Sequence, residues 1–261
     1  MIAALFPNGI NELFDWRAIF GEGSIWAFNK TAALALFSTA ICLFVFVIGG
    51  RKRALVPTGL QNVAEAGYEF VEKQIAEPVI GGHHGEGKKW APYLGVLFFF
   101  ILFMNIWSTV PPIQFPATSR IAIPIILSLS VWVAFIFAGF KAQGPLYPIK
   151  TCAPSGVPKA LLPLVFIIEF FSKFLVRPLS LSVRLFANML AGHVLISVFA
   201  IMTNELVVKH PSGVYQIPIG ILPFVMLVFM TIFELLVAFL QAYIFITLAA
   251  VYIGDSISTD H

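Results

Sequence analysis

Long uninterrupted apolar runs constrain this chain more than any other feature of its sequence. Several of them reach the roughly 18 to 20 residues that a helix needs to cross a hydrocarbon core about 30 Å thick. The 261 residues are 59% hydrophobic and only 11% charged, which lies outside the usual composition of soluble domains. The alternating pattern of a membrane β-barrel is missing, so backbone groups within lipid must be satisfied inside helices. We therefore predict an all-α, polytopic membrane protein that forms a single membrane domain over residues 1–261.

The apolar runs predict about five membrane-crossing segments. The first membrane helix is expected over residues 31–50, and a helix pair is expected over 92–140. Two longer stretches, 160–203 and 215–254, exceed one perpendicular span, because about forty helical residues extend roughly 60 Å. We expect these two stretches to form a long antiparallel helix hairpin that is steeply tilted, bent or partly outside the bilayer.

The segment between the first two membrane helices is more polar. Residues 57–80 place four glutamates and a lysine at helical spacing, with apolar residues on other sides. This pattern predicts an amphipathic helix on the cytoplasmic membrane surface, either a solvated connector or a docking site. The following "GGHHGEGKK" (81–89) is predicted to be a loop. His83 and His84 are adjacent, so their side chains diverge, and no further ligand has suitable spacing for a metal site.

Lysine and arginine are unevenly distributed between the two sides of this predicted topology. The segments 51–91 and 141–159 contain nine of them, whereas the segments on the opposite side contain four. Because positive loops stay cytoplasmic, the amino-terminal segment 1–30 is expected outside and the carboxyl terminus inside. The net charge of +3 and the lack of basic runs interleaved with aromatics argue against nucleic-acid binding.

The two long stretches contain ionisable residues within apolar sequence, which in membrane helices usually indicates function. Glu169 and Lys173 are four residues apart near the cytoplasmic end, and we interpret them, with Arg177, as a structural set. Arg184 lies further in. A guanidinium does not lose its charge, so Arg184 must find an anion or a water-filled cavity.

An antiparallel hairpin with equal rise would place Arg184 level with Gln241, and His193 level with Glu234. The second layer would lie about 13 Å further toward the outside. Glu234 and Gln241 share a helix face, but Arg184 and His193 point in nearly opposite directions. Both contacts therefore require curvature or a bulge in the first helix of the hairpin.

The segments "RPLSLSVRLFANMLAGH" (177–193) and "FELLVAFLQAYIFITLAAVYI" (233–253) resemble the signature of subunit a of F-type ATP synthases. "PYLGVLFFFILFMNIWSTVP" (92–111) resembles an earlier segment of that family. The resemblance implies that Arg184 is the essential charge opposite the carboxylates of the c-subunit ring. It places Asn188, His193, Glu234 and Gln241 along the proton path.

Two departures from the family pattern are visible. Many bacterial relatives have glutamate at the position of His193 and histidine at that of Glu234, so this chain has the exchanged arrangement. "ATSRIAIP" (117–124) lacks the Asp and Asn often found at the start of the third membrane helix.

The resemblance further implies a proton-translocating stator subunit with two aqueous half-channels, which has no catalytic activity of its own. Its expected partners are the c-ring, b-type peripheral stalk subunits, other ATP synthase subunits and membrane lipid. The chain has no "GxxxxGK(S/T)" loop, so we expect no bound nucleotide, and we expect no cofactor. The expected location is a bacterial plasma (inner) membrane, with an organelle inner membrane as the alternative.

Two other classes of function remain open from the residues alone. A secondary transporter would place intramembrane charges at a substrate site between repeats, but no internal repeat is visible. A structural membrane scaffold would leave the Arg, His, Glu and Gln set unexplained. Copurification with a ring of small two-helix subunits would separate these classes from a stator subunit.

Overall fold

The computed structural model describes residues 29–50, 59–81, 85–110, 117–152, 161–209 and 216–258. Within these ranges all regular secondary structure is helical, which confirms the all-α prediction. Five helices in the described part are long and apolar enough to cross a membrane, as the sequence predicted. These are Lys30–Ile48, Glu86–Ile106, Ala122–Gln143, Leu162–Leu206 and Gly220–Ile257.

The first half of the chain forms the helices from α2 to α7. The predicted amino-terminal segment 1–30 lies outside the described residues, apart from its last two positions. The helices that follow are α2 (Lys30–Leu43) with the π-helical turn η2 (Phe44–Ile48), then α3 (Leu60–Val71), the π-helical turn η3 (Glu72–Ala76) and α4 (Glu77–Ile80), then α5 (Glu86–Ile106), the 3₁₀ turn η4 (Ala117–Ser119), α6 (Ala122–Gln143) and α7 (Tyr147–Cys152).

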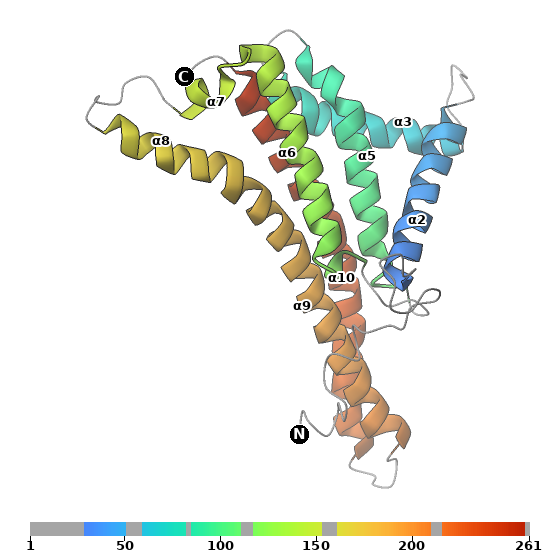
Figure 1. Cartoon of the computed structure of the whole chain (residues 1–261). Coiled ribbons are helices and arrows are strands. Elements are labelled where there is room, and N and C mark those ends of the chain that lie inside the picture. The colour runs from blue at the N-terminus through green and yellow to red at the C-terminus, as the bar shows by residue number, and fades with distance from the viewer. Residues whose placement is uncertain are drawn as a thin grey trace.

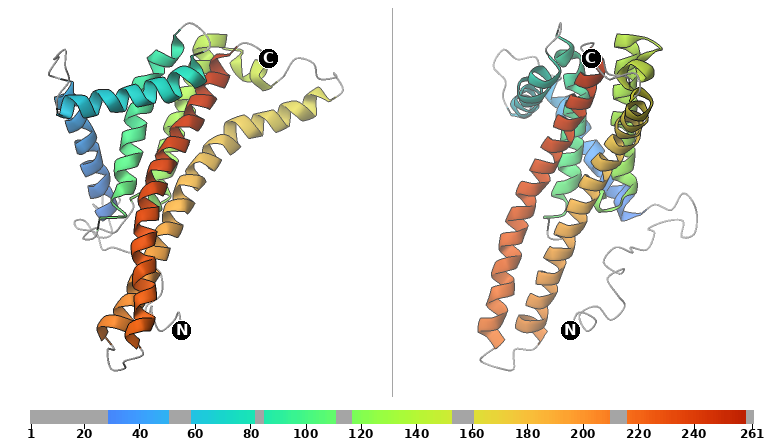
Figure 2. Two further views of the ribbon diagram at one scale, coloured as in Figure 1. Left: turned by 180° about the vertical axis from the view of Figure 1, so that it is seen from behind. Right: turned by 90° about the vertical axis from the view of Figure 1, so that its left-hand side faces the viewer.

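The second half forms the long hairpin. Its first arm is one continuous helical path made of α8 (Leu162–Phe171), the π-helical turn η5 (Ser172–Val176), α9 (Arg177–Thr203) and the π-helical turn η6 (Asn204–Lys209). Its second arm is α10 (Gln216–Ile257). Figure 2 shows α9 and α10 side by side over most of their length, extending beyond the shorter helices.

The amphipathic segment α3 lies across the ends of α2 and α5 (Figures 1 and 2). Val71 and Ile75 are fully buried, whereas Glu69 and Lys73 are exposed and form an ion pair. The apolar side therefore packs on the bundle while the charged side remains in solvent, as expected for a helix at a membrane surface.

Helix α5 begins at Glu86, six residues before the predicted start at residue 92, so the predicted loop over 81–89 is wrong for its last four residues. Two features stabilise the helical residues on the amino-terminal side of Pro92. Glu86 places a negative charge in the first turn, and Lys89 pairs with it. Gly87 lets this turn approach the junction of η3 and α4, since a Cβ there would lie 2.6 Å from the Ala76 carbonyl oxygen. His83 and His84 lie outside the described residues.

Small residues on α10 allow the helices of the bundle to approach closely. Helix α10 packs against α5, α6 and α9. Its inner face contains a series of fully buried alanines, and large residues of α5 and α6 pack around them. Without a hydrophobic driving force between helices in lipid, such small residues allow the van der Waals contact that holds them together. The alanines are Ala238, Ala242, Ala249 and Ala250.

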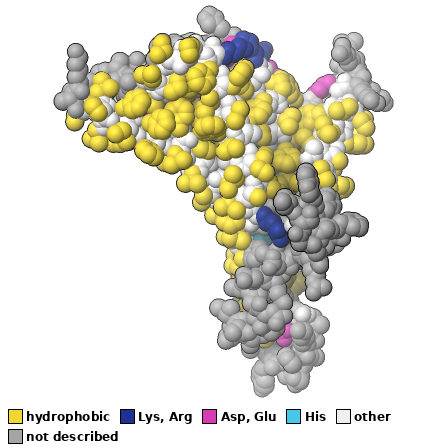
Figure 3. Space-filling model, in the orientation of Figure 1, with side chains coloured by type: hydrophobic (Ala, Val, Ile, Leu, Met, Phe, Trp, Pro, Cys, Tyr) yellow, Lys and Arg dark blue, Asp and Glu magenta, His cyan; other side chains and the backbone are white. Residues whose placement is uncertain are grey.

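The outer surface of the bundle is strongly apolar, as Figure 3 shows over α6, α8 and α9. Large exposed hydrophobic side chains occur on every candidate membrane span. An apolar surface of this extent fits contact with lipid or with other membrane subunits.

The first arm of the hairpin is bent, in agreement with the prediction that it cannot be one perpendicular span. Figure 1 shows the first arm curving along its length, so that α8 is directed away from the line of the lower part of α9. The bend is tethered at η5, where the Trp132 indole donates to the Phe174 carbonyl at 2.9 Å. Lys173 donates to the Thr151 carbonyl at 2.5 Å and pairs with Glu169 at 3.1 Å, so the two residues form the ion pair that their spacing predicted.

Because Lys173 has two partners and Glu169 has one, the two residues should differ in their contribution to stability. We expect Glu169→Gln to cost about 0 to 1 kcal/mol, as for a partly solvated ion pair. Lys173→Met also removes the bond to Thr151 and should cost about 1 kcal/mol more. Thermal unfolding of the purified protein in detergent measures both. An equal loss of stability for Lys173→Met and Glu169→Gln would contradict the additional contribution of the bond to Thr151.

Candidate functional site

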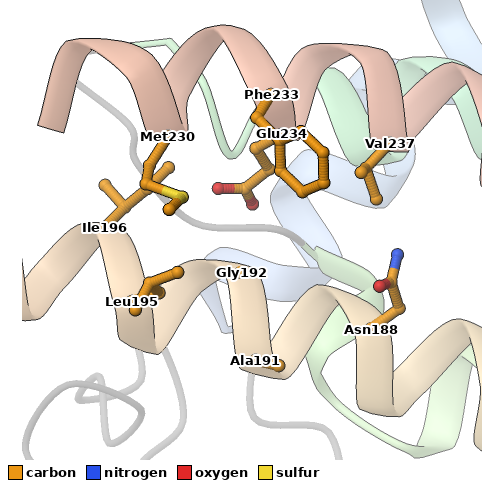
Figure 4. Close-up of a pocket in the computed structure, with 9 residues that line it drawn as sticks. All are labelled: Asn188, Ala191, Gly192, Leu195, Ile196, Met230, Phe233, Glu234 and Val237. Atoms are coloured by element: carbon orange, nitrogen blue, oxygen red, sulfur yellow. The ribbon is translucent and has the colours of Figure 1, made fainter. Parts of the chain in front are cut away.

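Glu234 lies between the two arms of the hairpin and is only 4% exposed. Figure 4 shows its carboxylate pointing from α10 toward α9. Both carboxylate oxygens are buried, and neither has a hydrogen-bond donor among the described residues. The hydroxyl of Ser108 lies beside this carboxylate but donates its proton to the Asn105 carbonyl at 2.8 Å. A buried carboxyl group without a donor needs water or a proton.

A cavity of about 180 Å³ adjoins Glu234. The amide of Asn188 extends into it from α9, and its Nδ2 atom is buried without a hydrogen-bond acceptor among the described residues (Figure 4). The cavity is large enough for several water molecules, and these two side chains provide polar partners for them. The remaining lining is mostly apolar: Ala191, Gly192, Leu195, Ile196, Met230, Phe233 and Val237.

Gly192 is the residue of α9 that faces the Glu234 carboxylate. A Cβ atom at this position would lie 3.1 Å from Cδ and 3.2 Å from Oε1 of Glu234. The missing side chain therefore leaves the space that the carboxylate occupies. The sequence analysis did not select Gly192. It placed Glu234 level with His193, the next residue along α9, and this position could have pointed to Gly192.

The sequence predicted that His193 lies level with Glu234, and the observed contact with Gly192 agrees with this to within one residue. The direction of the His193 side chain is a separate question. His193 is buried, and it does not line the cavity that contains Glu234. Helix α9 is regular from Arg177 to Thr203, so no bulge lies between Arg184 and His193 to turn both toward α10. Gly192, and not His193, borders the Glu234 carboxylate in the cavity. The functional role of the two polar layers stays a prediction.

His193 belongs to a different side of α9. The 3₁₀ turn η4 packs against α9. Gly192 and Leu195 line the Glu234 cavity and His193 does not, so the rotation of the helix between them places His193 on another side of α9. The predicted His193/Glu234 layer therefore has Glu234 on the cavity side of α9 and His193 on another side of α9.

A buried polar cluster lies at the nearby ends of α5 and η4. Thr118 donates to the Oδ1 atom of Asn105 at 2.7 Å, and both residues are fully buried. Ser108 and Ser119 are also buried here. The segment "ATSRIAIP", which contains neither Asp nor Asn, supplies hydroxyl groups at this position.

Arg184 is exposed on α9, and it makes no hydrogen bond or ion pair with any residue that the structure describes. Arg177, two turns earlier, pairs with Asp255 at 3.0 Å and lies 4.8 Å from the centre of the Tyr252 ring. Lys173 pairs with Glu169. The chain thus compensates two of these three cations itself. Gln241 is half-buried on α10.

These features define a polytopic helical membrane protein with buried ionisable groups in its longest hairpin. Residues 32–254 match the family model described as ATP synthase A chain. The chain belongs to the ATP synthase subunit a family.

Individual relatives are similar over nearly the whole chain. ATP synthase subunit a of Frankia alni is 40% identical over 259 residues, covering 97% of this chain and 86% of the relative. The subunit a of Parafrankia sp. is 44% identical over 242 residues, covering 89% and 77% respectively. That of Streptomyces lividans is 42% identical over 260 residues, covering 98% and 89%.

If Gly192 makes room for the Glu234 carboxylate, Gly192→Ala should displace this group by a few tenths of an ångström and slow proton transport about tenfold. Gly95→Ala is the matched control. It is also a glycine within a helix, but a Cβ there would meet no atom within 4 Å. Proton pumping per assembled complex in vesicles measures both, and an unchanged rate for Gly192→Ala would refute the packing argument.

Proposed function

We propose that this chain is the proton-translocating stator subunit of a rotary ATP synthase, with two aqueous half-channels and Arg184 acting against the carboxylates of the c-subunit ring. The observation that carries the proposal is that Arg184 is exposed and uncompensated, whereas Lys173 and Arg177 have carboxylate partners in the chain. A permanent charge within a membrane helix requires an anion or a wet cavity. A carboxylate arriving from a neighbouring subunit meets that requirement.

The surroundings of Arg184 support close approach by such a partner. The exposed face of α9 that contains Arg184 also contains Ser180, Ala187 and Ala191 at helical spacing. Small side chains on one face let another helix come near, which brings an opposing carboxylate within reach of the guanidinium.

The mechanism follows from the effect of Arg184 on a titrating partner. A protonated ring carboxyl group is neutral and can travel through lipid, but beside a guanidinium its ionised form is favoured. The proton therefore leaves toward the cytoplasm at Arg184, and the ring carboxylate takes up a new proton from the outer half-channel. The fixed charge also prevents a direct proton leak between the two half-channels.

The outer half-channel is proposed to pass Glu234 and His193, with Asn188 and Gln241 leading toward Arg184. The cavity beside Glu234 supports this path, because water there can exchange protons with the carboxyl group. The buried polar cluster around Asn105 and Ser108 lies next to Glu234 and is the proposed connection to the outside.

The partners and location follow from family membership and charge distribution. We propose contacts with the c-ring and with b-type peripheral stalk subunits, and ATP formation on other subunits of the complex. The relatives described above come from bacteria, which favours a bacterial plasma membrane over an organelle inner membrane. The excess of lysine and arginine at the end that contains α3 favours a cytoplasmic position for that end, with the amino terminus outside.

Arg184→Ala is expected to reduce proton-driven ATP synthesis in vesicles to background while the complex remains assembled. Arg184→Lys should also fail, because an ammonium is a compact point charge without the planar fork of a guanidinium. Arg177→Gln is the control. It removes an arginine that pairs within the chain, so assembly should fall while the rate per assembled complex is largely retained. A normal synthesis rate with either Arg184 variant would refute the assignment.

Replacing His193 or Glu234 singly with alanine should slow proton uptake about a hundredfold, since alkyl groups lack exchangeable protons. The double exchange His193→Glu with Glu234→His should recover more activity than the sum of the single exchanges predicts. A double-mutant cycle on proton-pumping rates measures this coupling. Strictly additive effects would show that the two residues act independently, as their positions on different sides of α9 also permit.

A further inference from the structure

A second cavity, of about 500 Å³, lies at the opposite end of the bundle from Glu234, between the start of α5 and the ends of α6 and α10. The proposed proton path does not use it. Its lining combines three charged side chains with aromatic ones: Glu86, Lys89, Trp90, Tyr93, Phe137 and Lys141. Figure 3 shows Lys and Arg side chains gathered at this end, directly above the apolar surface of α6.

The charges of this cavity favour an anion. Lys141 is exposed and forms no ion pair or hydrogen bond with any residue in the described ranges. Lys89 pairs with Glu86, three residues away on the same helix, in an exposed pair that another anion can replace at little cost. Two lysines against one glutamate leave a net positive charge around the cavity.

The neighbouring lysine has a different environment. Lys88 points away from the cavity toward the surface helix, where its ammonium lies 3.6 Å from Glu77 and 3.9 Å from Glu72. Lys88 therefore pairs with glutamates of the surface helix, whereas the adjacent Lys89 lines the cavity.

The aromatic residues place the cavity at the depth of lipid headgroups. Trp90 and Tyr93 pack edge to face with ring centres 6.0 Å apart. The Tyr93 hydroxyl lies 3.2 Å from the Ser130 hydroxyl, which joins α5 to α6. Tryptophan and tyrosine are enriched where the apolar and aqueous regions of a membrane meet.

An apolar stripe leads from the cavity toward the bilayer centre. Leu129, Val133 and Phe137 occupy successive turns on one face of α6, and all three are more than half exposed. Phe137 lines the cavity itself. A soluble anion would gain nothing from this stripe, whereas the acyl chains of a lipid would cover it.

We propose that this cavity binds the phosphate of an anionic phospholipid, with Lys89 and Lys141 as its ligands, Trp90 and Tyr93 as the interfacial frame, and the α6 stripe as the acyl-chain contact. Basic pockets between membrane helices on the cytoplasmic side are suited to such headgroups. The inference depends on the membrane-spanning fold and not on the role of Arg184, so it can fail or succeed independently of the proposed function.

The test uses the assembled complex, purified in detergent and washed free of lipid. It is titrated with phosphatidylglycerol in mixed micelles of detergent and phosphatidylcholine, and retained lipid is measured by native mass spectrometry. Lys141→Gln and Lys89→Gln should each weaken retention about fivefold, which corresponds to one lysine near an anionic headgroup. Lys88→Gln makes the same change in net charge outside the cavity and should leave retention unchanged. Glu86→Gln removes the competing carboxylate and should strengthen it.

Two further measurements distinguish the source of the anion. Glycerol phosphate, which has the headgroup phosphate without acyl chains, should not displace the lipid at equal concentration; displacement would show a site for soluble anions and overturn the proposal. A photocrosslinking residue, p-benzoylphenylalanine, at position 137 should label lipid in native membranes. Crosslinking only to a protein subunit, or equal losses for Lys88→Gln and Lys141→Gln, would also overturn it.

Discussion

A charge placed in hydrocarbon is costly unless a partner or water accompanies it, and the arrangement of the hairpin depends on how the chain meets this constraint. Near the end that contains α3, Lys173 is paired with Glu169, and Arg177 is held by Asp255 and Tyr252. Deeper along α9, Arg184 has no partner among the described residues. The chain therefore pairs two of these basic residues within itself, and we propose that the third is paired by another subunit of the complex.

Close helix approach is the second requirement, and it is met by residues with little or no side chain. The buried alanines of α10 bring it near α5 and α6, and Gly192 gives the Glu234 carboxylate room between α9 and α10. The end of α10 is fixed as well, because the Gln143 amide donates to the carbonyls of Ser256 at 3.2 Å and Ser258 at 2.9 Å. The contact with Gly192 gives Glu234 a defined position against α9, which the proposed proton exchange would need.

The bend at η5 affects both the position of the charged residues on the first arm and the packing of that arm against α10. A π-helical turn changes the local hydrogen-bond pattern. The Trp132 side chain of α6 donates to the Phe174 carbonyl there, and Lys173 donates to the backbone carbonyl of Thr151 in α7. The bend directs α8 away from α10, while the regular part of α9 remains beside it (Figure 2). Arg184 lies in this α-helical part, so its exposed position does not result from a π-helical turn.

The sequence by itself determined the helical class, the five spans, the long hairpin and its antiparallel level, because these depend on apolar length and helical rise. It also identified the Glu169–Lys173 pair, since residues four apart meet on one helix. Tertiary structure alone decided the start of α5 at Glu86 and the closeness of Gly192 to Glu234, because both result from contacts between distant segments. It likewise directed His193 to another side of α9, since helix rotation is set by packing and not by residue spacing.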